Sequence, residues 1–484
     1  MQMMSKFVEF DREELDQRRQ ITKQALLERR QSVTLDGKKF MMWPLFFRSN
    51  SSVPESEADV CTSALGIVAG SKFELVKDSP AYQAISDAVS LLLYMRNKDG
   101  SWPTHISLVG RKKLVMEGVI NDTYYALRAL MSIDFLSQTP KVKIRAGKKL
   151  KEKDARCAFI EESVNWLLHN RVSSGWRYTG IAYLENPEDR FQLPACTTPS
   201  AHTIIILSQV MDQLRNYSPH SAVIAEIQSA IDETVRWFHD TCNSDGGFGA
   251  KASDASKVSN TAKVILALSS VHYSPDVKDR AEKTLKRAVK WLTSHYDPDS
   301  IKTENVCEEF SQIIITPDGP LTRNVIHEDF IEPLLIEAMI RYKQYCHTND
   351  VRQYKKRKVN AVISQALEDL LALQVESGDM RGLVGSHRPI EEQRYTMYSC
   401  CDFFCAISLL IESRLDRAFV TNRRAARKCT RGLIVVFAVF FVIVLAAGYP
   451  KYFLAFAGGI LVLAREVLVS LATSRIEKKI FDQS

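Results

Sequence analysis

The sequence has few of the features that mark fibrous, secreted or disulfide-stapled proteins. Its 484 residues include only 20 glycines and 16 prolines, too few for a fibrous or low-complexity chain. The ten cysteines are scattered and form no Cys-x-x-Cys pair, which indicates reduced, buried thiols rather than a secreted framework. The first twenty residues are charged and lack an apolar run, so they are not a signal peptide.

The body of the chain also has no excess of charge. From Arg423 to Ser484, ten residues are basic and three are acidic, so this tail carries the whole net charge of +7. A basic footprint for nucleic acid on the body is therefore excluded, and we expect no nucleic-acid partner. The remaining composition, with 45% hydrophobic and 25% charged residues, is that of a globular protein.

Two long apolar runs lie near the carboxyl terminus. Residues 432–449 are uncharged, Pro450 interrupts them, and residues 452–464 continue the apolar character. We predict a two-helix transmembrane hairpin over 432–474, between a basic linker at 423–431 and a basic tail at 475–484. The positive flanks predict a two-pass protein of the inner or plasma membrane with both termini cytoplasmic, and a lipid membrane as partner.

The second predicted span carries two charges, Arg465 and Glu466. One interpretation is that they reach the membrane interface, where long charged side chains are tolerated. The other is that they line a polar path or the seam of a homo-oligomer. The sequence leaves both open, and it leaves a protein partner open as well.

Residues 1–422 contain a unit of about 60–80 residues that recurs six times. Each unit has a one-sided amphipathic helix, a glycine-containing turn and a second helix that is apolar almost all round. The clearest turns read Asp-Gly-Ser-Trp from Asp99, Ser-Gly-Trp from Ser174 and Asp-Gly-Gly-Phe-Gly from Asp245. The second helices are expected to begin near Asp59, Asn121, Ser200, Asn260, His327 and Tyr398.

Six outer and six inner helices that alternate along a chain predict an all-α, closed (α/α)6 toroid. A basic insertion near 137–156 separates two of the units. It is interpreted either as a solvated loop or as a contact with anionic lipid or an acidic partner.

These turns and the small-residue helices that follow them resemble the terpene-cyclase and protein-prenyltransferase toroid superfamily, with squalene-cyclase-type repeats, over about residues 40–420. The sequence departs from that pattern at the repeat glutamines, the catalytic acid and the metal ligands of the superfamily. The Gln that precedes the turn in such repeats is kept only at Gln374; Arg96, Asn170 and Cys242 replace it elsewhere. The Asp-rich acid segment of class II cyclases is missing, and so are the Asp-x-Cys and His zinc ligands of prenyltransferases. We therefore predict no metal and no cofactor, and assign no catalytic residue.

Six ionisable residues on the predicted inner helices are candidates for contacts with a ligand inside the ring. Asp122 and the cluster His327, Glu328 and Asp329 lie at expected helix starts, where caps and the helix dipole also explain them. Asp402 and His202 lie within apolar helices; a buried carboxylate needs a partner, whereas a buried histidine is commonly satisfied in the core. Parallel inner helices would also gather six N-termini on one face, which suits an anionic ligand.

Two functions fit this sequence. The first is a membrane-anchored cytosolic toroid that binds a ligand or partner as a sensor and is coupled to the hairpin, in the layout of antiviral defence effectors that perturb membranes. The alternative is a membrane-bound enzyme of the terpene-cyclase or prenyltransferase kind, which acts on an isoprenoid substrate. Because no catalytic set is recognisable, the sequence favours the first.

Overall fold

The computed structural model describes twelve α-helices and several short strands. The residues it describes are 12–44, 46–47, 58–103, 105–106, 108–109, 112–113, 118–137, 139–143, 150, 152–177, 194–297, 307–316, 319–328, 331–349, 356–385 and 395–413. The chain divides into two compact units, Met1–Glu412 and Ser413–Ser484. All twelve helices belong to the first unit.

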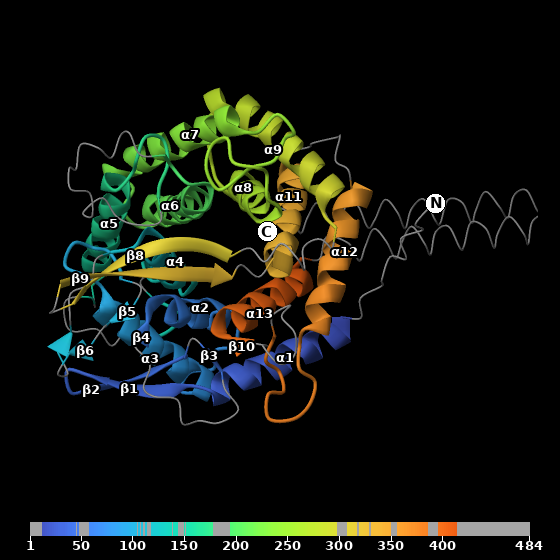
Figure 1. Cartoon of the computed structure of the whole chain (residues 1–484). Coiled ribbons are helices and arrows are strands. Elements are labelled where there is room, and N and C mark those ends of the chain that lie inside the picture. The colour runs from blue at the N-terminus through green and yellow to red at the C-terminus, as the bar shows by residue number, and fades with distance from the viewer. Residues whose placement is uncertain are drawn as a thin grey trace, which may run out of the picture. The chain divides into compact units, whose positions relative to one another are not determined.

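Six of these helices form an inner ring (Figure 1). Each contacts the next one along the chain, and the last contacts the first, so the ring is closed. They are buried on most sides; every residue of the first is buried. In order they are α2 (Val60–Gly70), α4 (Ile120–Ser132), α6 (Thr197–Tyr217), α8 (Val258–Ser270), α11 (Ile331–Thr348) and α13 (Met397–Glu412).

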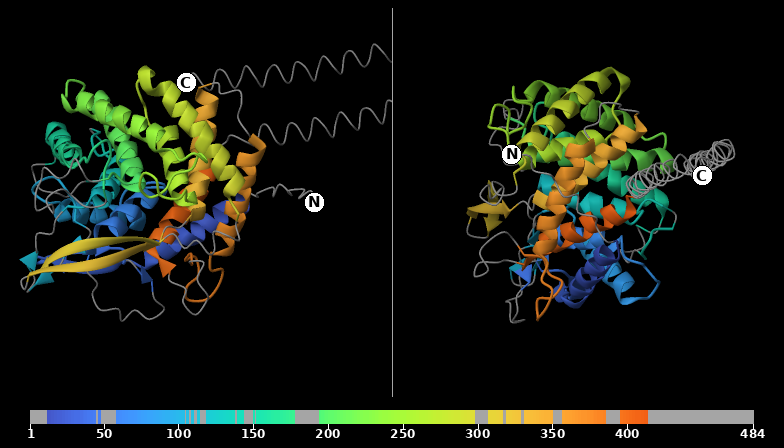
Figure 2. Two further views of the ribbon diagram at one scale, coloured as in Figure 1. Left: turned by 45° about the horizontal axis from the view of Figure 1, so that its top comes forward. Right: turned by 90° about the vertical axis from the view of Figure 1, so that its right-hand side faces the viewer.

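The other six helices lie outside this ring (Figures 1 and 2). They carry an apolar stripe toward the inner helices and charged residues toward solvent, as their amphipathic sequences require. They are α1 (Arg12–Glu28), α3 (Pro80–Met95), α5 (Lys153–His169), α7 (Val223–Thr241), α9 (Pro275–His295) and α12 (Lys356–Ala372). The two-layered ring confirms the predicted alternation of outer and inner helices.

The aromatic turns tie each outer helix to the inner helix that follows it. The indole N–H groups of Trp43, Trp102 and Trp176 donate to carbonyl oxygens within the preceding outer helix, at 2.7–2.8 Å. All three tryptophans are almost completely buried. Their rings therefore fill the space between the layers while their one polar group stays satisfied.

Glycine is required in these turns because each turn also touches the next outer helix. Gly100 has φ +97°, and a Cβ there would lie 2.7 Å from the carbonyl oxygen of Glu162 in α5. Gly246, with φ +98°, faces the carbonyl of Arg287 in α9 at 3.1 Å. Neither position accepts a side chain without strain. The repeated glycines thus set the spacing between neighbouring units.

The ring closes through contacts between the two ends of the folded body. The Gln374 amide donates to the Arg18 carbonyl and to the Thr22 hydroxyl of α1, and Thr22 in turn donates to the Gly382 carbonyl. Arg18 also forms an ion pair with Glu376. The helix α1 therefore packs against the turn that follows α12, and this contact joins the first repeat to the last.

The body is mostly helical, but it also has strands that the all-α prediction did not include, and the longest of them lie in one repeat. There the structure has a long antiparallel hairpin, β8 (Cys307–Thr316) and β9 (Gly319–Glu328), paired from Cys307 with Glu328 to Thr316 with Gly319. The β-branched run around Ile313 and the Pro-Asp-Gly-Pro segment at 317–320 favour a strand and its turn, not a helix connection.

The other strands form four short antiparallel pairs. They are β1 (Gln31–Leu35) with β2 (Lys38–Met42), β3 (Phe46–Phe47) with β10 (Tyr395–Thr396), β4 (Ala58–Asp59) with β5 (His105–Ile106), and β6 (Leu108–Val109) with β7 (Lys112–Lys113).

The predicted hairpin at 432–474, including Arg465 and Glu466, lies outside the described residues, as do the linker and tail beside it. Among the helices that are described, none has both the length and the hydropathy needed to cross a membrane. Of the basic insertion near 137–156, residues 138, 144–149 and 151 are outside the description, and α5 begins at Lys153.

Candidate functional site

The turns place the inner helices in a common register. The backbone N–H groups of Trp102, Trp176 and Phe248 donate to hydroxyls on the next inner helix, and the N–H of Val384 donates to a thiol. The four acceptors occupy equivalent positions; they are Thr123, Ser200, Thr261 and Cys400. Residues at equal distances beyond them therefore share a level of the ring.

Two residues beyond the acceptors, the ring has a layer of mixed polar side chains. They are Tyr125, His202, Lys263 and Asp402, on α4, α6, α8 and α13. Two of these, His202 and Asp402, are residues that the sequence singled out. We call this set the polar layer. Because it lies near the N-terminal ends of all four helices, it faces the mouth at which the inner helices begin.

Side chains of the inner helices meet across the interior of the ring. The rings of Tyr125 and Tyr398 are 6.4 Å apart at an interplanar angle of 81°, although α2 separates α4 from α13 in the ring. Arg128 of α4 and Glu337 of α11 form an ion pair with an N–O distance of 3.8 Å. Since α4 and α11 are opposite members of a six-helix ring, this pair spans its axis.

The two charged side chains of this pair are only partly buried. The side chains of Arg128 and Glu337 are 21% and 28% exposed, although both point inward from buried helices. Their neighbours Leu127, Leu130, Ile336 and Ala338 are completely buried. An exposed fraction of this size at the axis means that the two charges line a hollow. Desolvation of the ion pair is therefore incomplete, and its charges are tolerated.

An aromatic cluster lies beside the ion pair. Tyr124 stacks on the imidazole of His202 at 4.5 Å with an angle of 8°, and Tyr125 approaches the same imidazole edge-on at 6.0 Å. Arg128 donates to the Tyr124 hydroxyl at 3.4 Å, a long contact. Aromatic walls with a few charged groups are typical of small-molecule sites.

Electrostatics holds the guanidinium charged. Burial opposes the charge on Arg128, but the attraction of Tyr124, Glu337 and two further acidic groups outweighs it and raises its pKa well above the ordinary value. The thiol of Cys405, five residues beyond Cys400, is instead held in its uncharged form. Its burial, with Asp402 and Glu337 nearby, raises its pKa to about 12, so it remains protonated. That thiol is not a nucleophile at neutral pH.

The structure describes three of the four other predicted residues. Asp122 is 3% exposed and accepts a hydrogen bond from the Cys61 thiol of α2 at 2.7 Å. His327 and Glu328 are the last residues of β9, so the prediction that they begin an inner helix is wrong. That helix begins at Ile331, three residues after β9 ends. Asp329 is outside the described residues.

Sequence reasoning missed Arg128, Glu337, Tyr125 and Lys263. Lys263 gave a signal, because it is the one charged residue of α8, whereas α4 and α11 carry several other polar residues, so Arg128, Tyr125 and Glu337 do not stand out. For the predicted absence of a metal, the described residues contain no group of three or more His, Cys, Asp or Glu placed to hold an ion.

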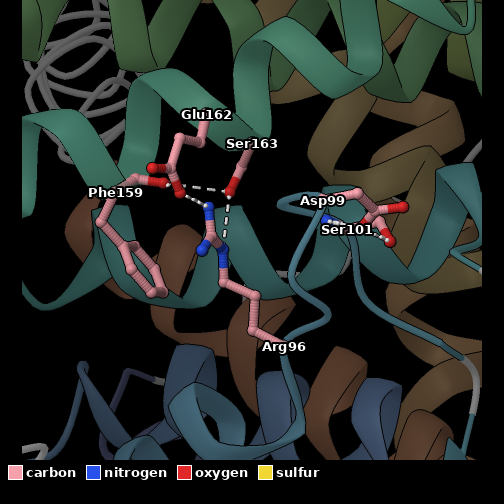
Figure 3. Close-up of polar contacts among 6 residues, drawn as sticks. All are labelled: Arg96, Asp99, Ser101, Phe159, Glu162 and Ser163. Carbon is pink, nitrogen blue, oxygen red and sulfur yellow. Dashed lines mark hydrogen bonds and ion pairs between the residues drawn. The ribbon is translucent and has the colours of Figure 1, made fainter. Parts of the chain in front are cut away.

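The outer wall of the ring contains a second hollow, of about 670 Å³. It is lined by Asp99, Glu162, Asn165, Trp166, Leu168, His169 and Glu226. At its edge Arg96, which stands in the repeat position of Gln374, contacts α5 three times (Figure 3). It donates to the Phe159 carbonyl and the Glu162 carboxylate at 2.9 Å and to the Ser163 hydroxyl at 3.2 Å.

The side chain of Arg96 is only 9% exposed, and its guanidinium lies 3.9 Å from the centre of the Phe159 ring. Burial lowers its pKa, and the hydrogen bond to Glu162 opposes that shift. Asp99 is likewise engaged within its own turn, where it accepts from the Ser101 N–H and hydroxyl. These polar groups join one repeat to the next, so we assign this cluster a structural role.

Comparison with known proteins identifies the fold. No protein family matches the sequence, and no curated protein matches it significantly. Solved structures do match: cellobiose 2-epimerase from Spirochaeta thermophila has a TM-score of 0.52 at 12% identity, over 84% of this chain and 97% of that one. The chain is an α/α toroid.

Two further structures extend the comparison. A family 76 glycoside hydrolase from Bacteroides thetaiotaomicron has a TM-score of 0.50 at 8% identity, over 84% of this chain and 78% of that one. A type II terpene cyclase from Scytonema has a TM-score of 0.44 at 14% identity, over 84% of this chain and 99% of that one. The toroid resemblance inferred from the repeats is thus confirmed for the fold. At these identities it says nothing of the reaction.

Proposed function

We propose that this toroid binds a small polar molecule inside its ring, at the level of the polar layer and the Arg128–Glu337 pair. One observation carries the proposal: two opposite charges from opposite sides of the ring meet at its axis and stay partly exposed. Charged groups are expensive to bury, and a fold held by apolar packing alone does not require them there. A polar ligand that hydrogen-bonds to both charges accounts for their position.

The same geometry disfavours an isoprenoid ligand at this level. A hydrocarbon chain in the hollow would displace water from Arg128 and Glu337 without replacing its hydrogen bonds. Each partly hydrated charge would lose water without gaining a hydrogen bond from the ligand. The alternative of a terpene-cyclase or prenyltransferase activity therefore gains no support from these side chains.

A catalytic role is the second candidate function. It is favoured by His202 and Asp402, which occupy equivalent positions on α6 and α13, opposite members of the ring. Two of the similar structures, an epimerase and a glycoside hydrolase, are named as enzymes that act on sugars. Imidazole and carboxylate groups on either side of a ligand can exchange protons with it. Turnover that is lost in Asp402→Asn while binding persists would establish this role.

A thermal-shift panel of polar metabolites, organic acids and isoprenoids tests the binding proposal on the full chain. At least one compound should raise the melting temperature of the wild type, since a ligand stabilises the state it binds. The shift should vanish in the Arg128→Met/Glu337→Leu variant and persist in Arg236→Gln, which changes an exposed ion pair on the outer wall. Equal shifts in both variants would place binding elsewhere.

We further propose that residues 432–474 hold the toroid at a membrane as a two-span hairpin with its body in the cytosol. The apolar runs and their basic flanks support this. The full chain should require detergent, whereas a chain that ends near Arg417 should be soluble and folded. A full chain that is soluble without detergent would contradict the tether.

Sensor and effector action, which the sequence suggests, would act through the same hairpin. Leucine at both Arg465 and Glu466 removes the charges of the second span and improves insertion or leaves it unchanged. An effector should then insert but no longer depolarise the membrane, whereas an anchor should be unaffected. If the wild-type chain never depolarises membranes, the effector role is excluded.

A further inference from the structure

We infer that the ligand of the ring is a neutral polyhydroxyl compound, one of whose hydroxyl groups bridges Arg128 and Glu337. This inference rests on the proposed binding function and names its ligand class. It derives from the spacing, the exposure and the charge balance of the pair, and from the aromatic rings beside it.

The spacing of the ion pair is that of a bridged contact. Its 3.8 Å separation exceeds the 2.7–3.2 Å of a hydrogen bond. The guanidinium's hydrogen bond to the Tyr124 hydroxyl is also long, at 3.4 Å. An oxygen at about 2.8 Å from each charge fits between them. A hydroxyl there accepts from Arg128 and donates to Glu337, which satisfies both.

Charge balance argues against a charged ligand. Glu337 already neutralises Arg128 in a place that is three-quarters shielded from water. A ligand carboxylate or phosphate would have to displace Glu337, leaving that carboxylate uncompensated and beside a new negative charge. A ligand ammonium would likewise face the guanidinium. A hydroxyl makes both hydrogen bonds and adds no charge.

The aromatic rings complete the site for such a compound. Tyr125 and Tyr398 stand nearly perpendicular, at 81°, and form two walls of a corner near the axis. Flat aromatic faces pack against the C–H surfaces of a cyclic polyol, while its hydroxyls point to the polar groups around it. A compound with apolar faces and a hydroxyl rim matches both kinds of wall.

Calorimetric titration of the full chain with three probe classes tests this inference. The probes are cellobiose and myo-inositol as polyols, citrate as an organic anion, and geranylgeraniol as an isoprenoid. A polyol should bind to the wild type. Glu337→Gln keeps the shape and an acceptor but removes the charge, and should weaken that binding at least about tenfold. Arg236→Gln should leave the affinity unchanged.

Because Arg128 substitutions perturb a buried charge, the melting temperature of each variant is measured beside its affinity, and Arg128→Lys serves as the milder change. It keeps the charge but loses the forked donor, so it should also weaken polyol binding. Binding of citrate alone, changed by Glu337→Gln, would overturn the polyol inference and leave the proposed function standing. Binding of geranylgeraniol alone would overturn both, because the proposed ligand is polar. Binding of no class at millimolar concentration would overturn both.

Discussion

The Arg128–Glu337 contact across the ring can be measured as a coupling free energy. Two unit charges 3.8 Å apart attract by about 4 kcal/mol at an effective dielectric constant near 20. The partial exposure of both side chains and the lack of a direct hydrogen bond reduce this to about 2 kcal/mol. Arg128→Met and Glu337→Leu should therefore each cost about 2 kcal/mol of unfolding free energy, because each leaves one charge uncompensated.

The double variant should cost about 2 kcal/mol in total rather than the sum of the two single costs, since it leaves no orphaned charge. Denaturant titration followed by circular dichroism gives these values. The matched control is the exposed pair Arg236–Asp276 on the outer wall, 39% and 61% exposed, where the coupling should stay below about 0.5 kcal/mol. A cross-ring coupling no larger than that of the control would refute the contact and the ring geometry that brings it about.

Three further predictions concern the turns and the half-buried thiol of Cys405. Gly100→Ala should cost at least about 2 kcal/mol of unfolding free energy, because its Cβ would meet the Glu162 carbonyl at 2.7 Å. Gly378→Ala, at φ +77° with open space around it, should cost about 1 kcal/mol, and equal costs would contradict the close packing of Gly100 against α5. At pH 8, the half-buried Cys405, with a pKa of about 12, should hold about a thousandfold less thiolate than a thiol of pKa 9.0. Iodoacetamide should therefore modify it far more slowly in the native chain than after denaturation; equal rates would contradict its raised pKa. The same pKa shift should lower the free energy of unfolding as pH rises from 9 to 12, because the thiol ionises first in the unfolded chain. The contribution of the Cys405 thiol to stability is fully present below pH 9, and Cys405→Ala should flatten this part of a stability–pH curve.

The repeated architecture was predictable because each unit carries its own local signals. An amphipathic outer helix, a turn glycine and a buried tryptophan recur, so Gly100 and Trp102 indicate the same kind of junction as Gly175 and Trp176. The repeat that contains β8 and β9 lacks the tryptophan, and the apolar run that follows His327 placed the expected helix start too early. Helix-start residues and a strand end carry the same acidic side chains, so charge alone could not separate them.

The candidate site was predictable only in part. His202 and Asp402 are visible as ionisable groups in apolar helices, and they occupy the polar layer. Arg128 and Glu337 were not found, because an inner helix that is apolar almost all round shows no face in its periodicity. Their pairing depends on which helices stand opposite each other in the closed ring. That is a property of the whole chain, and no local pattern contains it.

The most direct test of the hollow at the ring axis is the accessibility of a thiol placed there. The thiol introduced by Glu337→Cys replaces a side chain that is 28% exposed, whereas that of Ile336→Cys lies at a completely buried position on the same helix. A small methanethiosulfonate reagent applied to the native full chain should modify the first within minutes and leave the second unmodified until the protein unfolds. Equal rates at the two positions, or protection of both, would contradict an accessible interior and with it the proposed binding site.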